Sequence, residues 1–126
     1  MFSHIMIGSN DIARSKKFYD ALFTAIGGQP GTEPREGRLA YTHNGSRFMV
    51  TKPNDGKPAT AANGGTIGFP CTSPEQVKAF HDAGVANGGK SIEDPPGWRE
   101  GAAGRLYLGY LRDPYGNKIV GVHRGS

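Results

Sequence analysis

His4 is the first side chain that could do chemistry, because it stands in a short apolar run that ends at Gly8. An imidazole there could ligate a metal, act as a general base or make a structural hydrogen bond. Cys71 is the single cysteine, and no histidine or cation stands beside it, which favours an inert buried thiol over a nucleophile. The sequence has no glycine-rich phosphate loop and no serine nucleophile elbow.

Aromatic and cationic side chains near the C-terminus are the other candidates for binding. Trp98 lies in a Pro-Pro-Gly loop, where it could cover a cavity or a subunit seam. Arg99 or Arg105 could then bind an anion. An equally supported alternative is that these arginines are solvated surface side chains without a ligand. Tyr107 and Tyr110 belong to one predicted strand, whose alternation puts them on opposite faces, so that either could offer a phenol to a ligand.

The remaining three histidines carry weaker signals. His43 stands beside an Asn-Gly pair and His81 lies in a predicted helix, and for both we expect a solvent-facing side chain. His123 is close to the C-terminus, where it could contact a partner chain or remain a surface residue at the end of a strand.

The segment from Asp113 to Asn117 is the clearest structural signal in the sequence. Pro114 presets φ for a turn, Gly116 accepts a positive φ, and Asp113 and Asn117 can bond their own backbone. Apolar runs flank these residues on both sides, so the segment predicts a β-hairpin with a fixed register. Register decides which side chains of the last strand face the interior.

The sequence also repeats itself at an offset of 62 positions. Lys, Phe, Asp, Ala and Gly recur in the same order around two amphipathic segments, each of which follows an apolar run and a cap-like cluster. The clusters are Ser9-Asn10-Asp11 and Thr72-Ser73-Pro74, typical of helix starts. We therefore predict two strand–helix–strand–strand–strand (βαβββ) units. The expected strands are 2–8, 29–33, 38–42 and 47–52, then 65–71, 90–93, 105–112 and 117–123.

Composition limits the overall organisation. A chain of 126 residues suits a single domain, which we divide into a first module of about 1–53, a linker at 54–63 and a second module of about 64–126. The repeated strand and helix pattern predicts an α+β fold class. Neither half could bury its own apolar face alone, so both modules should pack as one unit. The net charge of +4 mildly favours anionic ligands, and its scatter argues against nucleic acid. The lone cysteine and the absence of a leader pattern or a long apolar run favour a cytoplasmic protein away from membranes.

Several motifs together resemble one protein family. His4-x-x-x-Gly8, Ser15-x-x-Phe18-Tyr19, the segment 64–69 and the hairpin at 113–117 resemble the glyoxalase/bleomycin-resistance/extradiol-dioxygenase superfamily, also called vicinal-oxygen-chelate proteins. The 95–99 segment is similar to a loop in uncharacterised bacterial, lactoylglutathione-lyase-like members. The resemblance implies a half-open barrel with a concave cleft and a homodimer. It also implies four positions for metal ligands, which here hold His4, Met49, Thr66 and Val120.

These four residues make a poor ligand set. The thioether sulfur of methionine and the hydroxyl oxygen of threonine bind a hard or borderline metal ion weakly, and valine has no donor atom. We therefore expect no cofactor, and we expect a small organic molecule in the concave cleft, where the net charge favours an anionic one. The candidate cleft residues are His4, Thr66, Trp98, Arg99, Tyr107, Tyr110 and Val120. Two alternatives stay open: a lyase or dioxygenase whose altered metal site includes His4, and a structural or regulatory dimer without a ligand.

Overall fold

The computed structural model describes residues 1–102 and 104–125. The first module contains β1 (Ile5–Gly8), α1 (Ile12–Ala25), β2 (Thr32–Arg35), β3 (Arg38–His43) and β4 (Ser46–Thr51). The second contains β5 (Ile67–Pro70), α2 (Pro74–Ala86), β6 (Lys90–Ser91), β7 (Gly97–Gly101), β8 (Gly104–Arg112) and β9 (Lys118–Arg124). The predicted α+β fold with two βαβββ modules is confirmed, and β7 is one strand more than the pattern predicts.

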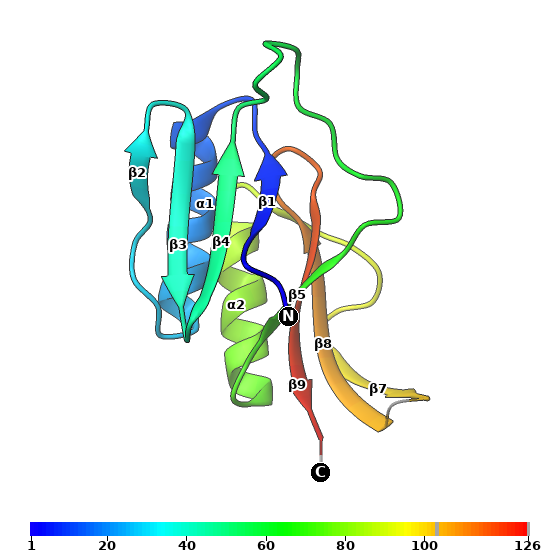
Figure 1. Ribbon diagram of the computed structural model, residues 1–126. Helices are drawn as coiled ribbons and strands as arrows, with labels where there is room; N and C mark the ends of the chain where they lie inside the picture. Colours follow the sequence, from blue (N-terminus) through cyan, green and yellow to red (C-terminus); the bar gives the residue numbers. More distant parts are fainter. Residues whose placement is uncertain (103, 126) are drawn as a thin grey trace.

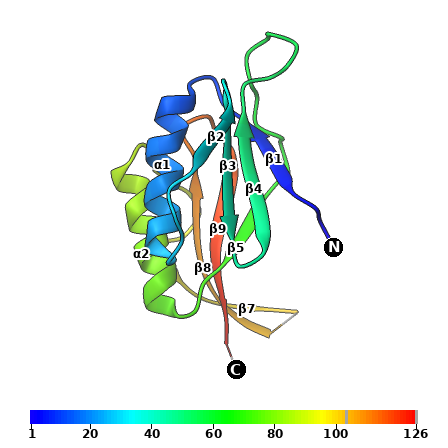
Figure 2. The same ribbon diagram turned by 60° about the vertical axis from the view of Figure 1, so that its left-hand side comes forward.

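Each module forms its own sheet. The first sheet has the strand order β1-β4-β3-β2, and the second has the order β5-β9-β8-β6, with β7 also paired to β8. In both sheets the first strand runs parallel to the last strand of its module, and the other pairs are antiparallel. Helices α1 and α2 lie side by side on one side of the strands, which leaves the opposite faces uncovered by helices (Figures 1 and 2). We call these two helix-free surfaces the open faces.

Local sequence signals explain where the helices begin. The Asp11 carboxylate accepts a hydrogen bond from the backbone N–H of Arg14 at 3.2 Å, and the Ser73 hydroxyl accepts one from Gln76 N–H at 3.1 Å. Pro74 follows as the first residue of α2, where its missing N–H costs nothing. Both caps fall within the clusters that the sequence predicts as helix starts.

The Asp113–Asn117 turn ties the two modules together. Its Asp113 carboxylate accepts hydrogen bonds from the backbone N–H groups of Tyr115 and Asn117, at 2.8 and 3.0 Å. It also accepts one from the Tyr19 hydroxyl of α1 at 2.6 Å and one from the Asn117 side-chain amide at 2.8 Å. That amide donates to the carbonyl of Gly8 in β1 at 3.0 Å as well. Tyr19, Asp113 and Asn117 are all buried, and we call these three residues the turn lock.

Two sequence expectations about exposure and loops are wrong. His81 is only 7% exposed, and its Nε2 lies 2.9 Å from the Ser91 hydroxyl. It sits four residues after the buried Val77, and this helical spacing places both on the packed face of α2. The segment around Trp98 is not a loop but part of β7, paired to β8 over its whole length. Its alternation was hidden by Gly97 and Gly101, which are depleted in strands.

The long connection between the modules is anchored to the first one. The Asn10 side chain accepts a hydrogen bond from Ala59 N–H at 2.7 Å and donates one to the Ala59 carbonyl at 3.4 Å. A Cβ on Gly8 would lie 2.9 Å from the Cβ of Ala59, so this close passage needs a glycine in β1. The segment predicted as a linker is thus fixed where it crosses the start of α1. No helix among the described residues is long and apolar enough to cross a membrane.

Candidate functional site

The open face of the first sheet carries two of the four positions that the family resemblance marks. Ile5 and Ile7 pack against the core, so His4 and Met6 point to the open face by alternation. Met6 is paired with Met49, which is therefore on the same face and only 8% exposed. His4 is exposed just before β1, with its Nδ1 2.8 Å from the Ser3 hydroxyl. This face offers one imidazole next to two thioethers.

The open face of the second sheet carries the other two positions. Val120 is paired with Gly68 on one side and Tyr110 on the other, and Ile119 beside it faces the core. Thr66 is exposed just before β5, two residues from Gly68 and on the same face. Val120 is 5% exposed. The Lys118 ammonium lies 4.8 Å from the centre of the Tyr110 ring and is ion-paired with Glu93.

The donor chemistry of these four residues does not fit a divalent metal. Val120 has no donor atom, Met49 supplies a thioether and Thr66 a neutral hydroxyl, which leaves His4 as the one strong ligand. Within residues 1–102 and 104–125, no group of three or more His, Cys, Asp or Glu side chains is placed to hold a metal ion. We therefore derive no chemistry through a metal at these positions.

Trp98 and Tyr107 lie on the other side of the second sheet. Tyr107 is paired with both Trp98 and His123, and the Trp98 ring meets Tyr107 edge-on with centroids 5.2 Å apart. Gly109, two residues along β8, packs against α2, so this cluster faces the helix side, away from Val120 and Tyr110. Tyr107 and Tyr110 therefore face opposite ways, as their spacing predicts.

The two candidate arginines near Trp98 already have partners. Arg99 donates to the backbone carbonyls of Gly97, Asp94 and Pro95, at 2.8 to 3.1 Å. Arg105 stacks on Trp98 with its guanidinium carbon 3.9 Å from the ring centre, and its Nε is 3.7 Å from the Glu100 carboxylate. Arg99 thus ties β7 to the segment before it, and Arg105 holds β8 against β7.

Cys71 has the properties expected of an inert thiol. It is buried, and burial raises the pKa of its thiol to about 11, so the reactive thiolate is scarce at neutral pH. Its backbone carbonyl lies 3.2 Å from Nδ1 of His123, which makes His123 part of the packing at the end of β9.

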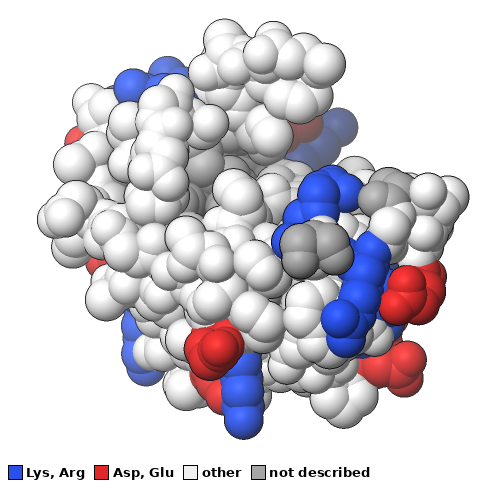
Figure 3. Space-filling model, turned by 90° about the horizontal axis from the view of Figure 1, so that it is seen from below, with Lys and Arg blue, Asp and Glu red and all other residues white. Residues whose placement is uncertain are grey.

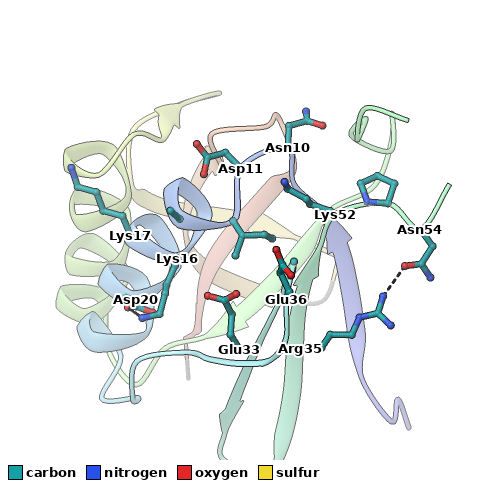
Figure 4. Close-up of a pocket in the computed structure, with 14 residues that line it drawn as sticks. Asn10, Asp11, Lys16, Lys17, Asp20, Glu33, Arg35, Glu36, Lys52 and Asn54 are labelled. Carbon is teal, nitrogen blue, oxygen red and sulfur yellow. Dashed lines mark hydrogen bonds and ion pairs between the residues drawn. The ribbon is translucent and has the colours of Figure 1, made fainter. Parts of the chain in front are cut away.

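A wide cleft of about 1030 Å³ lies between α1 and the β2–β3 hairpin (Figure 4). It is lined by both signs of charge. Lys16 is 2.6 Å from the Asp20 carboxylate, which also accepts hydrogen bonds from Gly31 N–H and the Tyr41 hydroxyl. Partial burial acts to raise the pKa of Asp20, but these three donors outweigh it and the pKa is lowered. The Lys16–Asp20 pair and its two neighbouring donors therefore have a structural role in the wall of this cleft.

A second, mainly apolar cavity of about 510 Å³ lies at the junction of the two modules. We call it the seam cavity. Its wall includes Phe2, Ile5, Phe23, His43, Arg47, Phe48, Thr66 and Phe69. Sequence reasoning missed it, because its buried aromatic residues come from α1, β4 and β5 and no local pattern connects them. Only Thr66 was a sequence candidate among these residues.

Comparison with known proteins identifies the class to which this fold and these open faces belong. The model of the Glyoxalase/Bleomycin resistance protein/Dioxygenase superfamily matches residues 1–120. A crystal structure of a glyoxalase/bleomycin resistance protein from Albidiferax ferrireducens T118 is 55% identical, with a TM-score of 0.95 over 98% of this chain and 99% of that one. The chain belongs to this superfamily.

More distant solved structures share the fold. A putative glyoxalase from Bacillus halodurans is 19% identical, with a TM-score of 0.76 over 98% of this chain and 95% of that one. A glyoxalase-related enzyme from Fulvimarina pelagi is 18% identical, with a TM-score of 0.74 over 98% and 88% of the two chains. A search among curated proteins gave no match. The superfamily hosts different activities on one fold, so the function must be argued from the residues of this chain.

Proposed function

We propose that this protein binds a small organic molecule at its open faces without a metal. The observation that carries the proposal is the chemistry at the four family metal positions, where His4 is accompanied by Met49, Thr66 and Val120. A site that has three apolar or weakly donating groups at these positions suits an apolar ligand better than a cation. Family membership and the fold support the open faces as the place where the ligand binds. The weak or missing donor atoms of Met49, Thr66 and Val120 support binding without a metal.

The open faces supply both apolar surface and a few polar groups. Met6 and Met49 are flexible thioether side chains that adapt to irregular ligands. Tyr110 adds a phenol next to Val120, and His4 and Thr66 add hydrogen-bonding groups at the ends of β1 and β5. A ligand of mixed character, with an apolar body and one or two polar groups, would satisfy this lining.

Screening small organic molecules by thermal shift in EDTA tests the proposal. We expect ligands that raise the melting temperature equally with and without added Zn²⁺. For any such ligand, Tyr110→Ala should weaken binding by about tenfold, because ring contact and the phenol hydrogen bond are lost together. Tyr115→Ala is the matched control, since Tyr115 lies on the turn against Arg14. Ligands that bind only when metal is added, or a Tyr110→Ala variant that binds as well as wild type, would refute the proposal.

We also propose that the protein is a homodimer. Among the described residues, β1 and β5 are each paired on one side only, and exposed strand edges need cover. Phe2 and Met6, near the β1 edge, are exposed apolar side chains. Light scattering at micromolar concentration should give about twice 13.4 kDa. A mass of 13.4 kDa under these conditions would count against a dimer.

A further inference from the structure

The seam cavity is built from both modules at one end of the molecule. The turn between β3 and β4 and the strand β5 lie in the lower half of Figure 1, and Figure 3 shows the molecule from below. Much of this surface is uncharged, while Lys, Arg, Asp and Glu side chains gather toward its right and its rim (Figure 3). The cavity volume of about 510 Å³ is within the range of sites that enclose a small molecule.

Three phenylalanine rings form the floor of this cavity. The ring centroids of Phe23, Phe48 and Phe69 are 5.3 to 6.0 Å apart in all three pairs. Each residue is between 4% and 8% exposed, so the rings are fixed by packing and present only a small part of their surface to the cavity. Such tilted and edge-on arrangements offer both ring faces and ring edges, which is the environment that a further aromatic ring prefers.

The rim of the cavity carries positive charge without a carboxylate. Arg47 is the cation of the lining, and His43, whose ring stands edge-on to Phe23 at 6.1 Å, is its other basic residue. The lining contains no Asp or Glu. Arg47 is exposed, and no ion pair or hydrogen bond of its side chain is found within the described residues. This cation therefore differs from Lys16 and Arg35 of the wide cleft, which have partners.

We propose that the seam cavity binds a small aromatic carboxylate, with its ring on the Phe23–Phe48–Phe69 floor and its carboxylate on the Arg47 guanidinium. A guanidinium binds a carboxylate through two parallel hydrogen bonds, which would fix the orientation of the ligand. The floor of the seam cavity faces the core side of the sheets, which distinguishes it from the open-face site. Arg47 and Thr66, which alternate with Phe48 and Ile67, stand at the border of both sites.

The test compares two probes of similar shape and different charge: 2-naphthoate and 2-naphthalenemethanol, titrated into the full chain in EDTA by calorimetry. Wild type should bind 2-naphthoate at least about fivefold more tightly than the neutral alcohol. Arg47→Gln should remove that preference and leave the affinity for the alcohol unchanged. Lys78→Gln is the matched control, because Lys78 is an exposed cation on α2 away from the cavity, and it should keep the preference.

A second variant blocks the cavity itself. Ser46 is exposed, lines the cavity and shares the face of β4 with Phe48, so Ser46→Trp should fill the space and abolish binding of both probes. Aromatic residues suit strands, and the substitution buries no polar group, so the fold should be retained. Tyr110→Ala, on the open face, should leave naphthoate binding unchanged.

Three results would overturn the inference. One is no binding of 2-naphthoate to wild type at about 1 mM. Another is a preference for 2-naphthoate that persists in Arg47→Gln, binding of either probe that persists in Ser46→Trp, or binding that is lost in Tyr110→Ala, which would place the probe on the open face. The third is a halved mass by light scattering in Ser46→Trp, because the mouth of the cavity would then be covered by a second copy of the chain. If the thermal-shift screen refuted ligand binding at the open faces, the results expected for 2-naphthoate in the seam cavity would not change.

Discussion

A double variant, Thr66→His with Val120→Glu, should bind Zn²⁺, Co²⁺ or Ni²⁺, whereas the wild type should show little response. Together with His4, the new side chains supply two imidazoles and a carboxylate, a set that suits a divalent ion with open positions. In EDTA the variant should melt below wild type. Val120 is buried, and an unpaired carboxylate there costs about 2 kcal/mol or more of folding free energy.

Added metal should restore this lost stability. A free metal concentration about 100 times the dissociation constant adds about 2.7 kcal/mol, which differential scanning fluorimetry detects readily. The triple variant that also carries His4→Ala is the control, because it keeps the new histidine and glutamate but removes the third ligand. If the double variant folds and binds metal no better than wild type, His4, Thr66 and Val120 do not share a site. If the triple variant binds metal as tightly as the double variant, His4 is not part of the site.

Asp113→Ala should destabilise the protein more than the loss of any other polar side chain of the turn lock. It leaves the buried Tyr19 hydroxyl, the Asn117 amide and two backbone N–H groups without their acceptor. Buried donors without partners cost free energy, so we expect a loss of about 3 kcal/mol or more, or roughly 10 °C in melting temperature. Chemical denaturation monitored by circular dichroism measures this loss.

Asp55→Ala is the matched control for the turn lock. Its carboxylate accepts a hydrogen bond from the backbone N–H of Lys57 within a turn, but it is exposed and joins no other element, so we expect a change within about 0.5 kcal/mol. Tyr19→Phe should lie between the two variants. Equal stabilities of Asp113→Ala and Asp55→Ala would show that the turn does not hold the modules together.

The turn lock also predicts how stability changes at high pH. Burial, followed by the charge of Asp113 and its hydrogen bond, raises the pKa of Tyr19 well above 10. The folded state therefore retains this proton more tightly than the unfolded state. Its contribution to stability is complete below about pH 10 and is lost as the pH rises toward the folded pKa.

Local signals made much of the fold predictable. The Asp113–Asn117 turn and the two helix caps depend on residues next to one another, and the structure contains all of them. The Asn-Gly pair beside His43 likewise forms the turn between β3 and β4. Asn44 and Gly45 both have positive φ, at 50° and 81°, as such a two-residue turn requires. The repeat at 62 positions gave the order of the elements, since each half had to follow the same chain path.

Contacts between distant residues were beyond sequence reasoning. Tyr19 and Asp113 are 94 positions apart, and nothing in either segment indicates that they meet. The floor of the seam cavity likewise combines one ring from α1 with rings from β4 and β5. For the candidate site, the family resemblance gave the four positions, and alternation already put Tyr107 and Tyr110 on opposite faces. The sequence could not show which tyrosine shares a face with Val120 or that Trp98 lies beside Tyr107, because both depend on strand pairing.

The metal content of protein purified without chelators tests the central claim of metal-independent binding most directly. Elemental analysis of the wild type and of His4→Ala should give less than about 0.1 equivalent of any divalent transition metal per chain in both, because His4 alone holds such an ion weakly. One equivalent per chain in the wild type, lost in His4→Ala, would contradict the account and favour a lyase or dioxygenase with an altered metal site.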